Sequence, residues 1–201
     1  MLLSHLRLPT HHITAWNGTF WDDSSLDALG LAVHLHHPST VCPDGSETAI
    51  ILIGDINGFC NVRVCYGPLS AENTKGRQLL RHGFFPCSDI CPKSAFTIAA
   101  LEHFSLFGTL GKNSTHKFYA VLERLTKTGF PDGVSDRYRE LALTHRKYSY
   151  IMALKRSGKA YTTHPNPEYQ DSMAIQCVAC PQPGINFKIE EVKENERLVF
   201  R

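Results

Sequence analysis

The stretch AIILIGDINGFCNVRVC, residues 49–65, decides the fold of the first part of this chain. Isoleucine and leucine residues lead up to the dipeptide Asn57-Gly58, and Val62 and Val64 alternate with polar residues after it. Asn-Gly between two β-forming runs is the strongest short-range signal for a hairpin. The stretch therefore predicts two antiparallel strands joined by a tight turn.

The sequence around this hairpin divides into a β part and a helical part. The β part covers residues 26–70 and includes a further expected strand in LGLAVHLHHP, residues 29–38. The helical part covers residues 71–158, where apolar residues recur at helical spacing. The predicted helices lie within residues 93–108, 113–129 and 135–158.

The composition predicts a soluble globular protein that does not enter a membrane. Of its 201 residues, 42% are hydrophobic and 20% are charged, and the net charge is +2. No apolar run approaches the roughly 20 residues that a membrane span needs, and the first residues do not form a secretory signal. The seven cysteines are therefore expected inside the cell, as thiols or metal ligands and not as a disulfide framework.

The decapeptide CVACPQPGIN, residues 177–186, has the form of a metal-binding knuckle. Cys177 and Cys180 can turn both thiolates toward one ion, and tetrahedral zinc then needs two further ligands. The same spacing occurs in redox sites, but those need a thioredoxin-like βαβ setting that the sequence does not indicate. The predicted fold class is α+β: a small antiparallel, zinc-ribbon-like β region, a helical segment, and a closing C-terminal CxxC knuckle within residues 172–187.

Other residues able to bind a metal form three further pairs. These are His5 with His11, His37 with Cys42, and Cys60 with Cys65. A hairpin that carries one pair of ligands and faces a CxxC from elsewhere in the chain is how zinc-ribbon sites are built. Each pair also has a simpler interpretation, because a histidine is often a surface residue and a free cysteine often behaves as a small buried apolar residue.

Four segments together resemble the second type of CxC-like cysteine-cluster domain. They are CVACPQPGIN, HHITAWNGTFW, HPSTVCP and PDGVSDRYRELALTHRKYSYIMALKRSGK, and the resemblance runs from residue 4 to residue 186. This domain accompanies KDZ (Kyakuja–Dileera–Zisupton) transposases in fungal mobile elements. The resemblance implies a non-catalytic module with zinc as its cofactor, which sits ahead of a transposase catalytic domain in a nuclear protein.

The resemblance also gives each candidate ligand a place in the family's pattern. His5 and His11 match the closing histidines of a B-box-like finger, His37 and Cys42 match an H-x-G-x-x-C-P region, Cys65 matches the first cysteine of an F-C-x-C string, and Cys177 and Cys180 match the last pair. The implied partners of the CxxC pair are Cys65 and one of Cys60, Cys42 or His37.

This chain departs from the family's pattern at three places. Gly67 stands where the second cysteine of F-C-x-C would be, and Cys60 stands where relatives carry a histidine. The cysteines of the B-box-like finger would lie before Met1, so residues 1–25 are expected to be a remnant of that finger. The CxC-like domain is then expected over residues 26–187, and residues 188–201 form a charged tail.

A basic segment in the last predicted helix indicates a nucleic-acid contact. The candidate residues are Arg137, Arg139, Arg146, Lys147, Lys155 and Arg156. Basic side chains with tyrosines among them can hold phosphates, although a solvated helix face would have the same composition. We therefore expect DNA, a KDZ transposase catalytic domain or another protein as the partner, and no small-molecule substrate.

Two alternatives to an accessory zinc module remain open from the sequence. The chain could be a truncated piece of a DDE-type transposase, in which acidic residues hold two metal ions. Its acids, among them Asp55, Asp89, Asp132 and Glu140, show no pattern that would bring them together. The chain could also be an inactive remnant of a mobile element, which the departures from the family's pattern favour.

Overall fold

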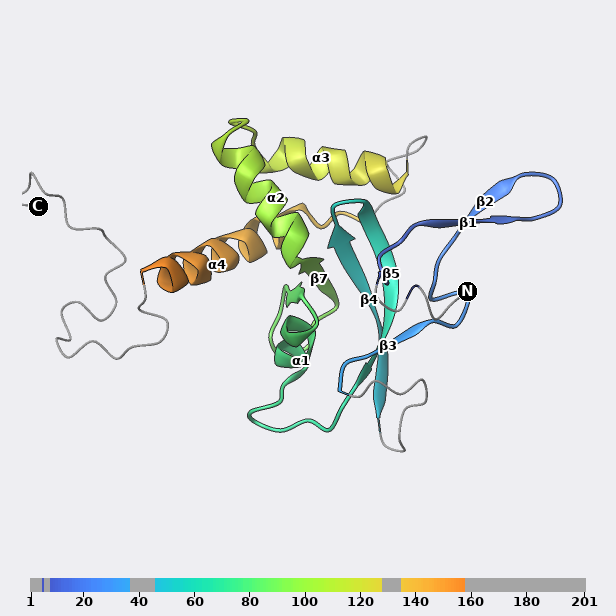
Figure 1. The fold of residues 1–201 in the computed structure, drawn as a ribbon, viewed down its shortest axis with the longest axis horizontal. Coiled ribbons are helices and arrows are strands. Elements are labelled where there is room, and N and C mark those ends of the chain that lie inside the picture. Colours follow the sequence, from blue (N-terminus) through green and yellow to red (C-terminus); the bar gives the residue numbers. More distant parts are fainter. Residues whose placement is uncertain (1–4, 6–7, 37–45, 128–134, 158–201) are drawn as a thin grey trace, which may run out of the picture. The chain divides into compact units, whose positions relative to one another are not determined.

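The computed structural model describes residues 5, 8–36, 46–127 and 135–157 (Figure 1). The elements are β1 (Ile13–Trp16), β2 (Trp21–Ser24), β3 (Ala32–His34), β4 (Glu47–Asp55), β5 (Gly58–Tyr66), α1 (Lys75–Arg81), β6 (Phe84–Pro86), β7 (Ser94–Thr97), α2 (Ile98–Thr109), α3 (Thr115–Thr126) and α4 (Tyr138–Arg156). The chain divides into two compact units, Met1–Met152 and Ala153–Arg201. The fold class is α+β, as predicted. None of the described helices is both long and apolar enough to cross a membrane.

The strands form a two-stranded sheet, β1–β2, and a five-stranded sheet in the order β3-β5-β4-β7-β6. The antiparallel pairing of β4 with β5 confirms the predicted hairpin. However, β3 runs parallel to β5, and β7 runs parallel to β4. The prediction of an antiparallel β region is therefore wrong, because the sheet is mixed. Tertiary packing chooses the direction of an added strand, and the alternating pattern of that strand does not show it.

The turn of the hairpin lies one residue earlier than the sequence predicts. Asp55 pairs with Gly58, so Ile56 and Asn57 form the turn. Gly58 has a φ of +109°, and a Cβ added there would lie 2.7 Å from Thr126 Oγ1 and 2.8 Å from Thr126 N. The same Thr126 hydroxyl accepts a 2.7 Å hydrogen bond from the Phe59 N–H. The glycine thus allows the end of α3 to pack directly on the start of β5.

The two faces of the hairpin contribute to two different hydrophobic cores. Ile51, Ile53, Val62 and Val64 face the first core, which Leu79 of α1 completes. Phe59 and Leu52 face the second core. The helical residues of that second core are Leu101 and Phe104 from α2, Phe118, Tyr119 and Leu122 from α3, and Leu141 and Tyr148 from α4. This division follows from the alternation of side chains along each strand.

Two strands, β6 and β7, lie inside the part that was predicted to be helical, residues 71–158. The predicted helix within 93–108 begins only at Ile98, because residues 94–97 form β7. Thr97 ends that strand and caps the helix, since its Oγ1 accepts a 3.1 Å hydrogen bond from Ala100 N. Strands of three and four residues are too short to show an alternating pattern. The other two predicted helices are confirmed as α3 and α4.

Asp55 joins three distant segments at the end of β4. Its side chain is buried, with 7% of the residue's surface exposed. Thr10 Oγ1 donates to its Oδ2 at 2.9 Å, and Thr97 Oγ1 donates to its Oδ1 at 2.6 Å. Because Thr97 also caps α2, one carboxylate connects the N-terminal segment, the hairpin and the start of α2.

Candidate functional site

Four of the predicted zinc ligands lie outside the described residues. They are His37, Cys42, Cys177 and Cys180. The C-terminal knuckle, residues 172–187, and the charged tail, residues 188–201, also lie outside them. Within the described part of the chain, no three His, Cys, Asp or Glu side chains are grouped so that they could hold a metal ion.

The structure brings His5 and His11 together. Their rings meet edge to face, with the centroids 5.5 Å apart. This is the proximity that two ligands of one finger would need, and the pair was predicted from a spacing of six residues. Among the described residues, no third His, Cys, Asp or Glu side chain lies close enough to bind a metal ion together with these two histidines.

Cys60 and Cys65 do not form a ligand pair. The ladder between β4 and β5 continues without interruption from Gly58 to Tyr66. Since the two cysteines are five residues apart on one regular strand, their side chains lie on opposite faces of the sheet. Cys60 packs against the first core. Cys65 is fully buried and disulfide-bonded, so the prediction that the cysteines are thiols or metal ligands does not describe it in this structure.

The environment of Cys60 opposes metal binding by this residue. Burial, with a smaller contribution from the Asp55 charge, raises the pKa of the Cys60 thiol to about 12. Its Sγ lies 3.7 Å from the carbonyl oxygen of Ile53, to which the thiol donates. Zinc binds the thiolate form of cysteine. Cys60 is therefore held as a neutral thiol, which suits a structural residue better than a ligand.

Gly67 occupies a position that has no room for a side chain. A Cβ added at Gly67 would lie 2.5 Å from Cγ of His36. The Gly67 N–H donates to Gln78 Oε1 at 2.8 Å, and this hydrogen bond holds the chain against α1. The His36 ring thus fills the space into which a cysteine at this position would project.

Three of the predicted nucleic-acid-binding residues lie on one exposed side of α4. Arg139, Arg146 and Lys147 are separated by seven and eight residues, which is about two turns of a helix. We call these three residues the basic stripe. Leu143 and Tyr150 lie on the same side and are 58% and 48% exposed. Lys155 and Arg156 are exposed in the last turn of the helix.

The opposite side of α4 is anchored in the protein. Leu141, Thr144 and Tyr148 are its buried residues. Glu140 is the one acidic residue in the sequence of α4, and it forms an ion pair with Arg137. Within the described part of the chain, no carboxylate pairs with the basic stripe. The exposed side of α4 therefore carries positive charge only.

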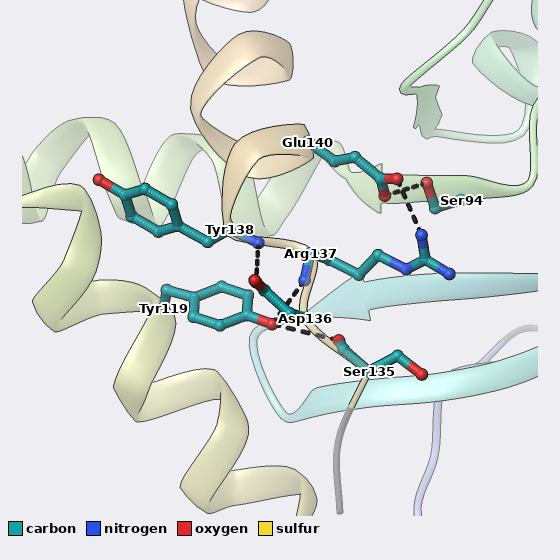
Figure 2. A network of polar contacts seen from close by, with 7 residues as sticks. All are labelled: Ser94, Tyr119, Ser135, Asp136, Arg137, Tyr138 and Glu140. Atoms are coloured by element: carbon teal, nitrogen blue, oxygen red, sulfur yellow. Dashed lines mark hydrogen bonds and ion pairs between the residues drawn. The ribbon is translucent and has the colours of Figure 1, made fainter. Parts of the chain in front are cut away.

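Arg137 differs from the other basic residues because it belongs to a polar network at the start of α4 (Figure 2). Its Nη1 donates to Glu140 Oε1 at 2.9 Å, and Glu140 Oε2 accepts a 2.6 Å hydrogen bond from Ser94 Oγ. The Arg137 N–H donates to the Tyr119 hydroxyl at 2.7 Å, and that hydroxyl donates to the Ser135 carbonyl at 3.2 Å. The network fixes the first turn of α4 against β7 and α3.

A cavity of about 570 Å³ lies beside this network. Its lining comes from the N-terminal segment, β2 and the turn after it, β4, β5, the end of α3 and the segment before α4. Leu26, Leu52 and Phe59 provide apolar wall, and Lys127 and Arg137 provide positive charge. Sequence reasoning did not find this cavity, because its residues come from segments that are far apart in the chain.

Residues 26–129 match the family model of the CxC2 like cysteine cluster associated with KDZ transposases. The match covers more than half of the chain. The chain belongs to this family. The resemblance found in the sequence is thereby confirmed. Neither the curated proteins nor the solved structures gave a match.

The residues matched by the model of this KDZ-associated cysteine cluster include all strands of the five-stranded sheet and the helices α1, α2 and α3. His37, Cys42, Cys60 and Cys65 fall within the matched range. The basic stripe and the decapeptide at residues 177–186 lie beyond it, so the roles of these two features rest on their own chemistry.

Proposed function

We propose that this chain is a non-catalytic zinc module that helps a KDZ-type transposase to contact DNA. The contact is made by the basic stripe, Arg139, Arg146 and Lys147. The observation that carries the proposal is the uniform positive charge on a helix side that faces away from the core. Such a module acts in the nucleus.

Duplex DNA is the partner that this surface suits. Exposed arginine and lysine side chains neutralise backbone phosphates and release counterions from the duplex. Leu143 and Tyr150 are exposed on the same side of α4 as the basic stripe, and a tyrosine hydroxyl is a common donor to phosphate and sugar oxygens. The contact holds the protein on the duplex without recognising its sequence, because the basic stripe contacts phosphates and not the edges of the bases.

Zinc is proposed as a structural ion held by the predicted ligands. The CxxC pair Cys177 and Cys180 supplies two thiolates, and two of His37, Cys42 and Cys65 supply the remainder. Cys65 qualifies only after reduction, since zinc needs a thiolate. The description of the family as a cysteine cluster supports this part of the proposal. Metal analysis of the protein purified under reducing conditions tests it, with Cys177→Ser/Cys180→Ser expected to lose bound zinc.

The DNA contact is tested by removing the charge of the basic stripe. The variant Arg139→Gln/Arg146→Gln/Lys147→Gln is expected to bind a labelled DNA duplex at least tenfold more weakly at low salt, measured by fluorescence anisotropy. These residues are exposed, so the substitutions leave the fold intact, and circular dichroism checks this.

A matched control separates a specific surface from the effect of net charge. The control variant Lys93→Gln/Lys117→Gln/Arg124→Gln also removes three positive charges. It takes them from exposed residues in the loop before β7 and in α3. The proposal expects this control to bind DNA nearly as well as the wild type. Equal losses in both triple variants would refute a role for this side of α4.

A further inference from the structure

The hairpin of β1 and β2 exposes three large aromatic side chains close together in the sequence. Trp16, Phe20 and Trp21 are 55%, 57% and 67% exposed. The two strands contribute no buried residue. Large apolar side chains that gather on a surface mark interaction sites. The three aromatic residues belong to the segment HHITAWNGTFW, residues 11–21, which takes no part in the proposed DNA contact.

The turn of this hairpin is ordered by its own polar groups. Asn17 Oδ1 accepts hydrogen bonds from the N–H groups of Thr19 and Phe20, both at 3.0 Å. Trp16 and Trp21 pair across the strands, with ring centroids 5.7 Å apart and an angle of 58° between the planes. A cross-strand aromatic pair stabilises a hairpin. More than half of the surface of each tryptophan nevertheless remains exposed to a partner.

The charge around the tryptophan pair is negative. Residues 8–62 contain no lysine and no arginine. Asp23 shares the face of the tryptophan pair because it lies two residues further along β2, and Asp22 carries a second carboxylate on the other face. Both aspartates are exposed, and neither forms an ion pair within the described part of the chain. Lys127 and Arg137 line the cavity that Asp23 also lines, but Asp22 and the tryptophans do not line it.

We infer that this hairpin binds an arginine- or lysine-rich segment of a partner protein. The face of a tryptophan ring attracts a guanidinium or ammonium group, and tryptophan is the best of the aromatic residues for this contact. Asp22 and Asp23 add carboxylates that pair with the same or a neighbouring cation. Nucleic acid suits the surface less well, because the two carboxylates repel the phosphates that accompany stacked bases. The inference goes beyond the proposed function, since the hairpin shares no residue with the basic stripe.

The tryptophan fluorescence of the intact protein reports on this surface alone, because Trp16 and Trp21 are the two tryptophans of the chain. The probe is a peptide of alternating arginine and glycine, and its counterpart has uncharged citrulline in place of arginine. The arginine peptide is expected to change the emission until saturation, whereas the citrulline peptide leaves it unchanged. No change with the arginine peptide, or an equal change with both peptides, overturns the inference.

Removing the carboxylates tests the charge of the surface without changing its shape. Asp22→Asn/Asp23→Asn is expected to bind the labelled arginine peptide about two- to tenfold more weakly in fluorescence anisotropy, as for two exposed ion pairs. The control Glu72→Gln/Asp89→Asn also removes two negative charges, from exposed residues in the loops before α1 and β7, and should bind as the wild type does. Equal losses in both double variants would reduce the effect to net charge and overturn the inference.

Replacing the rings tests the contact with the tryptophan faces. Trp16→Leu/Trp21→Leu keeps apolar side chains but removes the rings, and it is expected to bind the arginine peptide about fivefold more weakly or less tightly still. Trp16→Phe/Trp21→Phe keeps the cross-strand aromatic pair that stabilises the hairpin, so it should lose less. Unchanged binding by the leucine variant overturns the inference.

Two further titrations identify other occupants of the hairpin. If oligothymidylate changes the tryptophan emission and the arginine peptide does not, the hairpin binds single-stranded nucleic acid and the inference fails. If dilution of the protein alone changes the emission, and the variant without the basic stripe shows no such change, α4 of a second copy covers the hairpin and the inference of a separate partner also fails. The variant without the basic stripe should bind the arginine peptide as the wild type does, so this inference and the proposed function are tested separately.

Discussion

Replacing Asp55 by alanine should destabilise the protein by an amount that follows from its two hydrogen bonds. The change removes two hydrogen bonds, from Thr10 Oγ1 at 2.9 Å and from Thr97 Oγ1 at 2.6 Å. A hydrogen bond to a charged group contributes about 1.5–3 kcal/mol to stability. The lower value for each bond gives an expected loss of about 3 kcal/mol. At about 2–4 °C per kcal/mol, the melting temperature should fall by about 6–12 °C.

Urea unfolding followed by circular dichroism measures this loss. The exposed Asp89→Ala is the matched control, because it removes the same carboxylate outside any buried network. Thr10→Val removes only one of the two bonds. In Asp55→Ala/Thr10→Val the combined loss should therefore be smaller than the sum of the single losses, by about 1 kcal/mol or more.

The result that would refute this reasoning is a loss below about 1 kcal/mol for Asp55→Ala, equal to that of the control. It would mean that the carboxylate does not hold the three segments together. A confirmed loss would explain Asp55 as a structural residue, which removes one of the acids considered for two-metal catalysis.

Three further substitutions follow from the same structure. Gly58→Ala should lower the free energy of unfolding in urea by about 2–4 kcal/mol, because the new Cβ would clash with Thr126 and the backbone there has a positive φ. Gly18 also has a positive φ, +99°, but open space around it, so Gly18→Ala should lose only the strain contribution, and equal losses in the two variants would contradict the clash. Burial lowers the pKa of His145, so as the pH drops the unfolded chain takes up the proton before the folded protein does, and stability should fall below about pH 6.5. His145→Gln should therefore weaken the dependence of the melting temperature on pH, whereas the control His103→Gln, at an exposed residue, should leave it unchanged. Burial raises the pKa of Cys60 to about 12, so Cys60 should resist alkylation in the native protein while the exposed Cys91 reacts, and rapid labelling of Cys60 at neutral pH would contradict this. Cys60→Ser should leave the zinc content of the protein unchanged.

The hairpin was predictable from the sequence because all of its information is local. Asn57 and Gly58 mark the turn, and the flanking residues alternate or are continuously apolar. The one-residue displacement of the turn was not predicted by the local pattern; in the structure Gly58 lies against Thr126, which is far away in the chain. The helices α3 and α4 were predictable for the same local reason, since buried residues recur at helical spacing in each: Phe118 and Leu122 in α3, and Leu141, Thr144 and Tyr148 in α4.

The parallel strands and the cavity were not predictable because they depend on contacts between distant segments. Phe96 fits the helical spacing of the residues that follow it, yet it lies in β7 and pairs with Gly54 of β4. Cys60 and Cys65 look like a ligand pair in the sequence, but an odd separation on a regular strand turns them to opposite faces. This second error was avoidable, since the alternation rule needs only the sequence once the strand is assigned.

The salt dependence of DNA binding tests the central proposal most directly. The logarithm of the association constant, plotted against the logarithm of the salt concentration, has a slope of about −0.9 for each phosphate that is neutralised. We expect a steep negative slope for the wild type and a slope shallower by about 2.7 for the variant that lacks Arg139, Arg146 and Lys147. Identical slopes for the two proteins would contradict the proposal.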